Sequence, residues 1–110
     1  MTIYNPCLIH SVKASSDIEE HRFIGFDGNY CTEGAKALGV SDVSVESGEY
    51  VPVGVFGILV VLSDGTITSG SAVTSSDEGK AIAADDTSEI NGYALEDVSE
   101  GEEVRIIRGI

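Results

Sequence analysis

Hydrophobic positions along the chain fall into short runs that polar turns separate every few residues. Val, Ile, Thr and Ser dominate these runs, and 13 glycines punctuate the sequence. No window of about a dozen residues repeats apolar positions at i, i+3, i+4 and i+7, the spacing of an amphipathic helix. The pattern therefore predicts an all-β chain of short strands joined by frequent turns.

The longest apolar runs set the positions of the predicted strands. Residues 3–14 form an opening extended segment, and Pro6 keeps its first part at a sheet edge because proline cannot donate to a β-ladder. The run 51–62 is too short to span a bilayer and is interrupted by one proline and two glycines. It therefore predicts one or two buried strands. In all, about eight or nine strands fit the chain.

Turn signals connect these runs. The Asp-Gly-Asn segment at 27–29 predicts a tight turn after a short alternating run. Residues 63–65 and 76–80 carry Ser, Asp and Gly and predict hairpin turns. Ser16 and Glu19 have the spacing of a capping box, so one helical turn is expected at that point.

Two stretches of the chain match each other, "SDVSVESGEYVPV" at 41–53 and "EDVSEGEEVRI" at 96–106. In each, a glycine (Gly48 or Gly101) precedes two hydrophobic residues spaced two apart. The distance from the Asp to this glycine differs between the copies, which a catalytic loop would not tolerate and a connector would. We interpret each stretch as a turn, in which the glycine takes a positive φ, followed by a strand with one buried face.

Length limits the architecture to one domain. A chain of 110 residues with 42% hydrophobic residues can bury one core, and a second independent core is not expected. No linker or low-complexity tail divides the sequence. We expect residues 1–110 to form a small single-domain β-barrel or sandwich, with at most one or two short helical turns.

The net charge of −13 removes one class of function. Nineteen acidic residues stand against six basic ones and are spread along the chain. Binding to a nucleic acid needs Lys and Arg to displace counterions from the phosphates, so neither DNA nor RNA is an expected partner. The acidity fits a highly soluble surface, and attraction to a basic partner or to cations is the alternative.

Two cysteines, Cys7 and Cys31, occur without a CxxC or His/Cys ligand pair, so the sequence predicts no zinc site. Buried free thiols are the preferred interpretation, and pairing of the two stays open. The start "MTIYNPCLIH" has no basic region followed by a long apolar segment, so it does not match a signal peptide. We expect no membrane-spanning segment either.

Few side chains could carry catalysis. The two histidines are His10, in an apolar run, and His21, in a charged segment, and core packing or surface exposure is expected for each. No serine stands in a G-x-S-x-G elbow. Adjacent carboxylates would point to opposite faces of a strand, and no calcium-loop or phosphate-loop spacing is present. The sequence thus predicts no catalytic residue, no metal ligand and no cofactor.

One lysine raises an alternative. Lys80 follows the turn "SDEG" in a predicted hairpin, which is similar to the modified turn of lipoyl and biotinyl carrier domains. Two residues separate Asp77 from Lys80, and this spacing moves the lysine away from the tip of the turn. A solvated lysine after a turn is the preferred interpretation.

The whole chain resembles the capsid decoration, or cement, proteins of tailed bacteriophages. The pieces that carry the resemblance are "NPCLIHSVKASSDIEEHRFIGFDG" at 5–28, "ALGVSD" at 37–42, "SGEYVPVGVFGI" at 47–58, the "TSSDEGKAIAA" hairpin at 74–84 and "NGYALEDVSEGEEVRI" at 91–106. Each piece is ordinary turn-and-strand sequence, and their order over the full length makes the match. The central run, "GILVVLSDGTIT", is more apolar here than the family's pattern.

The resemblance implies a β-tulip-like fold and a structural role without enzymatic activity. Such proteins bind the outer surface of the assembled, expanded capsid and clamp neighbouring subunits of the major capsid protein. They commonly do so as homo-trimers, and dimeric placements also occur. The implied location is the virion, after synthesis in the cytoplasm of the bacterial host. Another virion module of the tail or a fibre is a further alternative.

The resemblance also directs attention to residues that could contact a capsid or another copy. Residues 1–10 could include an extended N-terminal arm whose unpaired part adds a strand to a capsid edge. Exposed aromatic residues are natural anchors of such contacts, and Tyr4 and Tyr50 are the candidates. For each of these two tyrosines, a position in the core is an equal alternative. The predicted interface residues are Thr2, Ile3, Tyr4, Asn5, Pro6 and Tyr50.

Overall fold

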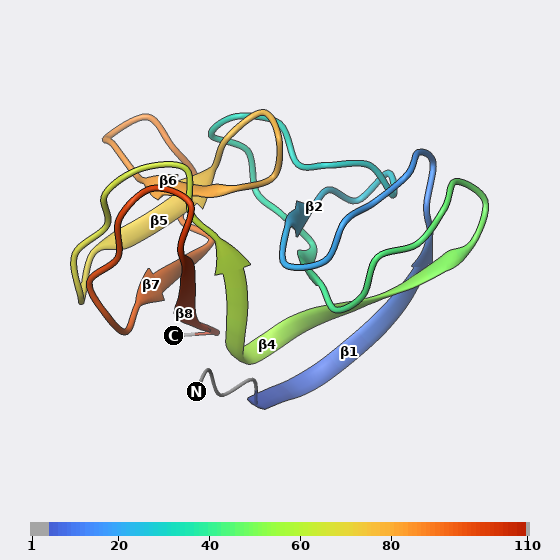
Figure 1. Ribbon diagram of the computed structural model, residues 1–110, viewed down its shortest axis with the longest axis horizontal. Helices are drawn as coiled ribbons and strands as arrows, with labels where there is room; N and C mark the ends of the chain where they lie inside the picture. The colour runs from blue at the N-terminus through green and yellow to red at the C-terminus, as the bar shows by residue number, and fades with distance from the viewer. Residues whose placement is uncertain (1–4, 110) are drawn as a thin grey trace.

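The computed structural model describes residues 5–109, with side chains from residue 8 onward. These residues form eight strands and no helix (Figure 1). None of them therefore forms a helix that could cross a membrane. The strands are β1 (Asn5–Lys13), β2 (Phe23–Ile24), β3 (Gly39–Ser41), β4 (Tyr50–Leu62), β5 (Ala72–Ser75), β6 (Ala81–Ala83), β7 (Gly92–Ala94) and β8 (Glu103–Arg108).

All strands belong to one antiparallel sheet that is nearly closed into a barrel. Its order is β2-β3-β4-β8-β7-β5-β6, and β1 pairs with β4 outside this path. The alternation of short strands with glycine-rich turns favours this arrangement, because a turn can return the chain beside the strand before it, as from β3 to β4, β5 to β6 and β7 to β8. The predicted all-β class and barrel-like architecture are confirmed.

β4 is the longest strand and connects the two halves of the sheet. Its first part pairs with β1 and β3, and its second part pairs with β8. The strand turns sharply near its middle (Figure 1), where Gly57 has a φ of 110°. Gly57 pairs with Pro6 of β1 on one side and with Arg108 of β8 on the other. The start of β1 and the end of β8 therefore flank the same bend.

The two halves repeat the same strand pairings. In the first, Phe23 of β2 lies opposite Val40 of β3; in the second, Ala72 of β5 lies opposite Tyr93 of β7. The next pairs along the sheet and the outer ladders follow the same register. In the first unit these pairs are Val40 with Gly54, Ser41 with Val53, and Lys13 with Tyr50. The corresponding pairs of the second unit are Tyr93 with Ile107, Ala94 with Ile106, and Leu62 with Glu103. The chain thus contains two copies of one structural unit, which share β4.

The two matching sequence stretches occupy the same place in each unit. Gly48 and Gly101 adopt φ values of 92° and 87° in turns that lead into β4 and β8. A glutamate closes each turn, because Oε1 of Glu49 accepts the N–H of Glu46 at 2.7 Å and Oε1 of Glu102 accepts the N–H of Ser99 at 2.6 Å. The interpretation of these stretches as turn and strand is confirmed.

The core also repeats, in two clusters. The smaller cluster contains Ile18, Ile24, Val51 and Val53, and the corresponding positions of the second unit are Ile67, Val73, Val104 and Ile106 in the larger cluster. The larger cluster also takes in Phe23 and Val40 from the first unit. Burial of these side chains is the main force that holds the short strands together.

Two sequence expectations about local structure are wrong. The predicted helical turn at Ser16 is absent, because Ile18 forms a β-bridge with Val45 and pairs the segment with the first repeated turn. Residues 63–65 are not a hairpin, because Ser63 N–H donates to Glu102 O at 2.9 Å and the partner of β4 is β8. The hairpin at 76–80 is confirmed, with Ser75 opposite Ala81. The apolar run 51–62 forms a single strand.

Candidate functional site

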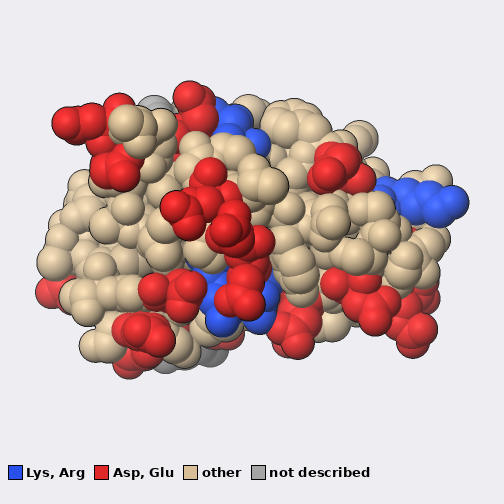
Figure 2. Space-filling view, turned by 90° about the horizontal axis from the view of Figure 1, so that it is seen from above, with Lys and Arg blue, Asp and Glu red and all other residues tan. Residues whose placement is uncertain are grey.

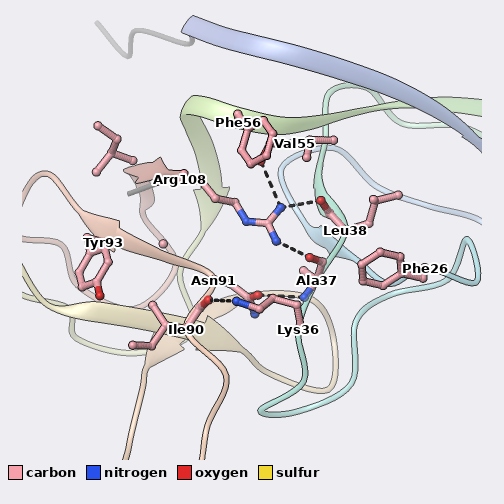
Figure 3. Close-up of a pocket in the computed structure, with 13 residues that line it drawn as sticks. Phe26, Lys36, Ala37, Leu38, Val55, Phe56, Ile90, Asn91, Tyr93 and Arg108 are labelled. Atoms are coloured by element: carbon pink, nitrogen blue, oxygen red, sulfur yellow. Dashed lines mark hydrogen bonds between the residues drawn. The ribbon is translucent and has the colours of Figure 1, made fainter.

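A groove of about 410 Å³ lies where the bend of β4 meets the end of β8 (Figure 3). Four segments that are distant in sequence form it: the loop between β2 and β3, the bend of β4, the start of β7 and the end of β8. Its lining residues are Phe26, Lys36, Ala37, Leu38, Val55, Phe56, Ile90, Asn91, Gly92, Tyr93, Ile107, Arg108 and Gly109.

Three of the lining side chains are large, apolar and exposed. Phe26 is 71% exposed, Phe56 48% and Ile90 41%. Phe56 continues the apolar surface onto β1, because it lies opposite Leu8, which is itself 46% exposed. Contiguous apolar surface that a folded chain leaves in water is typical of a contact site for another macromolecule.

Arg108 holds the groove together from within. Its Nη1 donates to Leu38 O at 2.5 Å and to Val55 O at 3.3 Å, and its Nη2 donates to Ala37 O. The guanidinium thus ties β8 to the β2–β3 loop and to β4. Burial lowers the pKa of Arg108 from its ordinary value because the charged form loses solvation.

The loop segment 35–38 is fixed by a second set of polar contacts. Asn91 is fully buried; its Oδ1 accepts the N–H of Ala37 at 2.9 Å, and its Nδ2 donates to Ala35 O at 2.8 Å. Lys36 lies between Ala35 and Ala37 in sequence, and its Nζ donates to Ile90 O at 2.7 Å. Hydrogen bonds from Asn91 to the backbone on both sides of Lys36 therefore hold this exposed lysine at the groove.

The charges of the groove differ from those of the rest of the molecule. Acidic side chains are spread over the face seen in Figure 2, and no Asp or Glu lines the groove. Within the described residues, Lys36 and Arg108 form no ion pair with a carboxylate. Three other cations do, in the pairs Arg22–Glu19 at 2.5 Å, Lys80–Glu78 at 3.5 Å and Arg105–Glu96 at 2.9 Å.

The predicted interface residues that the structure describes do not come together at one site. Thr2, Ile3 and Tyr4 lie outside the described residues. Asn5 and Pro6 belong to β1, opposite Ile58 and Gly57, so they are not part of an unpaired arm. Tyr50 is 67% exposed and pairs with Lys13 at the other end of the β1–β4 ribbon. The length of the ribbon therefore separates Tyr50 from Asn5 and Pro6.

The remaining candidate side chains lie elsewhere. His10 is exposed on β1. His21 has a φ of 62°, and its Nε2 lies 3.5 Å from Glu20 and 3.6 Å from Glu103. Lys80 is partly buried and paired with Glu78, so it does not project from the tip of the hairpin. Among the described residues, no group of three or more His, Cys, Asp or Glu is placed to hold a metal ion.

Cys31 is a free cysteine in the larger core cluster, as expected for one of the two thiols. Burial raises the pKa of this thiol from its ordinary value, because the thiolate would lose solvation, and a hydrogen bond with Ser75 partly opposes the effect. The group is therefore neutral near pH 7. The side chain of Cys7 lies outside the described part of the structure.

Sequence reasoning missed the groove. Phe26 lies directly before the predicted turn at 27–29, and Phe56 lies in the apolar run 51–62, so the local pattern predicts a contact role for neither. The one available signal was Phe26, a large apolar residue placed directly before the Asp-Gly turn at 27–28, where solvent exposure is expected.

Comparison with known proteins finds a matching family and similar solved structures. The family model described as phage cement protein matches residues 5–109. A solved structure, the N base of the head fiber gp8.5 of bacteriophage phi29, is similar with a TM-score of 0.79 and 22% sequence identity, over 93% of each chain. No curated protein matches the sequence. This similarity shows that the two chains share a fold.

Proposed function

Because this chain belongs to the phage cement protein family, whose members are structural, capsid-associated phage proteins, we propose a specific role on the phage head. The chain binds the outer surface of the assembled, expanded capsid and clamps neighbouring subunits of the major capsid protein. The observation that carries this proposal is the family match over residues 5–109, which is nearly the whole domain. The role needs no catalytic residue.

Mass action explains how binding stabilises a capsid. A protein that binds the assembled lattice, and not its separated subunits, shifts the equilibrium toward the assembled form. The acidic surface keeps free copies soluble and apart before they reach a capsid, since like charges repel. We propose a homo-trimer on the capsid, with a dimer as the alternative that a mass measurement of the bound complex would distinguish.

The N-terminal residues and Tyr50 remain proposed contacts, in a revised form. Asp42 N–H donates to Pro52 O at 3.0 Å, so the backbone carbonyl of Pro52 points toward β3 and away from β1. Ser11 of β1 lies opposite Pro52, and its N–H and C=O therefore point away from β4. Within the described residues no strand covers this outer side of β1. Residues 2–6 and the open side of β1 could thus join an extended capsid segment by β-strand addition.

Purified protein and expanded capsids that lack it provide the test. We expect saturable binding, a higher temperature of capsid disruption with the protein bound, and no binding to dissociated capsid subunits. Removal of residues 2–4 leaves the β1 pairs of Asn5 and Pro6 in place, so any loss of binding reports on the arm. Equal binding to separated subunits and capsids would contradict the clamp. Full occupancy by the truncated chain would contradict the arm.

A second candidate role follows from the structural neighbour. The fold is that of the base of a head fiber, so this domain could attach a projecting fibre to the phage head. Electron microscopy of saturated capsids separates the two roles, because a clamp adds compact density at the capsid surface and a fibre base supports a projection.

A further inference from the structure

We propose that the groove binds a segment of the major capsid protein in which a carboxylate side chain lies beside a bulky apolar side chain. This inference rests on the proposed function, because it identifies the chemistry of the capsid partner. Lys36 forms the ion pair with the carboxylate, and Phe26, Phe56 and Ile90 receive the apolar group. Arg108 is a positioning residue that holds the walls of the groove (Figure 3).

The cations of the groove carry the first step. In a chain of net charge −13, Lys36 and Arg108 are the two basic residues that meet in one groove, and no Asp or Glu lines it. Within the described residues, three of the four other basic side chains pair with carboxylates, and the fourth, Lys13, lies outside the groove. A positive site that an acidic protein leaves without a carboxylate favours an anionic group from a partner, because such a pair gains energy when water is excluded.

The hydrogen bonds divide the roles of the two cations. The guanidinium of Arg108 is partly buried and already donates to three backbone carbonyls. The ammonium of Lys36 is exposed and donates to one carbonyl, Ile90 O, although it carries three N–H groups. Lys36 therefore has donors left for a carboxylate, while Arg108 contributes positive charge behind it.

The apolar rim determines the rest of the ligand. Phe26, Phe56 and Ile90 surround the cations and together expose enough apolar surface to bury a large side chain. A free inorganic anion would leave this rim in water, and so would a phosphate backbone, which the surrounding acidic surface also repels. A peptide segment that combines an acidic and an apolar residue satisfies both parts of the site.

Electrostatics favours the capsid over a second copy of this chain as the source of the segment. A second copy brings a further −13 charge to an already acidic surface, so its approach is repelled outside the groove. A capsid surface with basic residues around one acidic segment would complement both the outer surface and the groove. Such an alternation of charge also fixes the orientation of the bound protein.

Matched variants test this inference on expanded capsids that lack the protein. Lys36→Glu and Lys80→Glu make the same change in net charge, but only Lys36 lines the groove, and Lys80 lies beside Glu78 at 3.5 Å. We expect Lys36→Glu to weaken capsid binding by about tenfold or more, because it removes a pair that binding desolvates. We expect Lys80→Glu to weaken it by at most about threefold, because that charge is remote from the groove. Lys36→Arg keeps the charge and should retain most of the affinity.

A second pair of variants tests the rim. Phe26→Ser removes an exposed apolar side chain at the groove, and Val43→Ser removes an exposed apolar side chain that does not line it. We expect about a tenfold or larger loss of capsid affinity for Phe26→Ser and a smaller effect for Val43→Ser. Because both side chains are exposed, the thermal unfolding of each variant should stay close to that of the unchanged protein, which controls for misfolding.

The outcomes separate this inference from the proposed function. If the unchanged protein does not bind capsids, the proposed function fails and the inference fails with it. If the protein binds and the groove variants behave like their controls, the groove inference alone is wrong. If Lys36→Glu and Phe26→Ser alter self-association in light scattering and leave capsid binding intact, the occupant is a second copy and the capsid segment is excluded.

Discussion

At the scale of single residues, backbone conformation explains why glycine occupies certain turn positions. Gly48 and Gly101 adopt positive φ at corresponding turns, and the space around each is open. His21 is the one described non-glycine residue with positive φ, and its amide donates to Ser41 O as that of Gly70 donates to Ala94 O in the second unit. The repeat therefore places a histidine where its other copy uses glycine.

Alanine at the two turn glycines should test this explanation. Gly48→Ala and Gly101→Ala should each lower the free energy of unfolding by about 1–2 kcal/mol, the cost of a left-handed conformation for a residue with a Cβ atom. The effects should be similar because a Cβ atom would meet nothing within 4 Å at either site. Urea unfolding of the purified variants gives the measurement.

Gly65 provides the control for these turns. A Cβ atom there also meets nothing within 4 Å, and its φ is not positive. Gly65→Ala should leave stability unchanged or raise it by up to about 1 kcal/mol, because alanine restricts the unfolded chain. A comparable loss at all three glycines would show that exposure of the turns, and not their φ, sets the cost.

At the scale of elements, the loop between β2 and β3 owes its position to one buried amide. Asn91 precedes β7 and satisfies one N–H and one C=O of the segment 35–37. Without it, the buried N–H of Ala37 would have no partner, which is costly, and Ala35 O would keep the weaker contact from Cys31 Sγ at 3.4 Å. The strand end thus fixes the loop that carries Lys36.

Replacement of this amide should loosen the loop. Asn91→Ala should cost about 1–3 kcal/mol of stability and speed hydrogen exchange at the amide of Ala37, because the buried N–H of Ala37 loses its partner. Asn29→Ala is the matched control: Asn29 also makes side-chain hydrogen bonds, with Ser16 and Tyr30, but it is exposed and water replaces them. An equal effect of the two changes would argue against burial as the cause.

The elements also show what a sequence pattern can and cannot predict. The strands flanking Gly48 and Gly101 followed from local turn chemistry and alternation, because both signals lie within a dozen residues. The expected hairpin at 63–65 failed because β4 pairs with β8 about 40 residues later, a long-range choice that turn composition does not encode. The prediction of a helical turn at Ser16 was wrong because the β-bridge between Ile18 and Val45 outweighed the local capping signal.

At the scale of the whole molecule, the two units are repeated but not separable. They share β4, and Phe23 and Val40 of the first unit pack in the larger core beside Val73 and Ile106 of the second. Loss of either unit would expose side chains of the other. The architecture thus couples the two halves through a common strand and a common core.

Unfolding should therefore be one cooperative transition. Calorimetry should give equal calorimetric and van't Hoff enthalpies, as expected for a small two-state domain. Val51→Ala in the smaller cluster should lower the midpoint of the entire transition, by several degrees for a loss of about 2 kcal/mol, and should not split it. Two resolved transitions, or a shift confined to part of the signal, would show that the units fold independently.

The groove can be identified only from the fold of the whole molecule. Phe26, Lys36, Phe56, Ile90 and Arg108 are far apart in sequence, and each belongs to a segment with an ordinary local explanation. Local patterns predicted a soluble acidic β domain and the absence of obvious chemistry. They could not bring these five residues together, since that depends on the order of strands around the nearly closed sheet.

The bend at Gly57 has a practical consequence for attaching other molecules to this protein. Gly57 pairs with Pro6 and with Arg108, so the start of β1 and the end of β8 lie about 10 Å apart, two strand spacings, at the edge of the groove. A label or cargo domain joined at either place would begin beside the surface that we propose to meet the capsid. For display on phage particles, insertion at the exposed turns near Gly48 or Gly101 is the better choice.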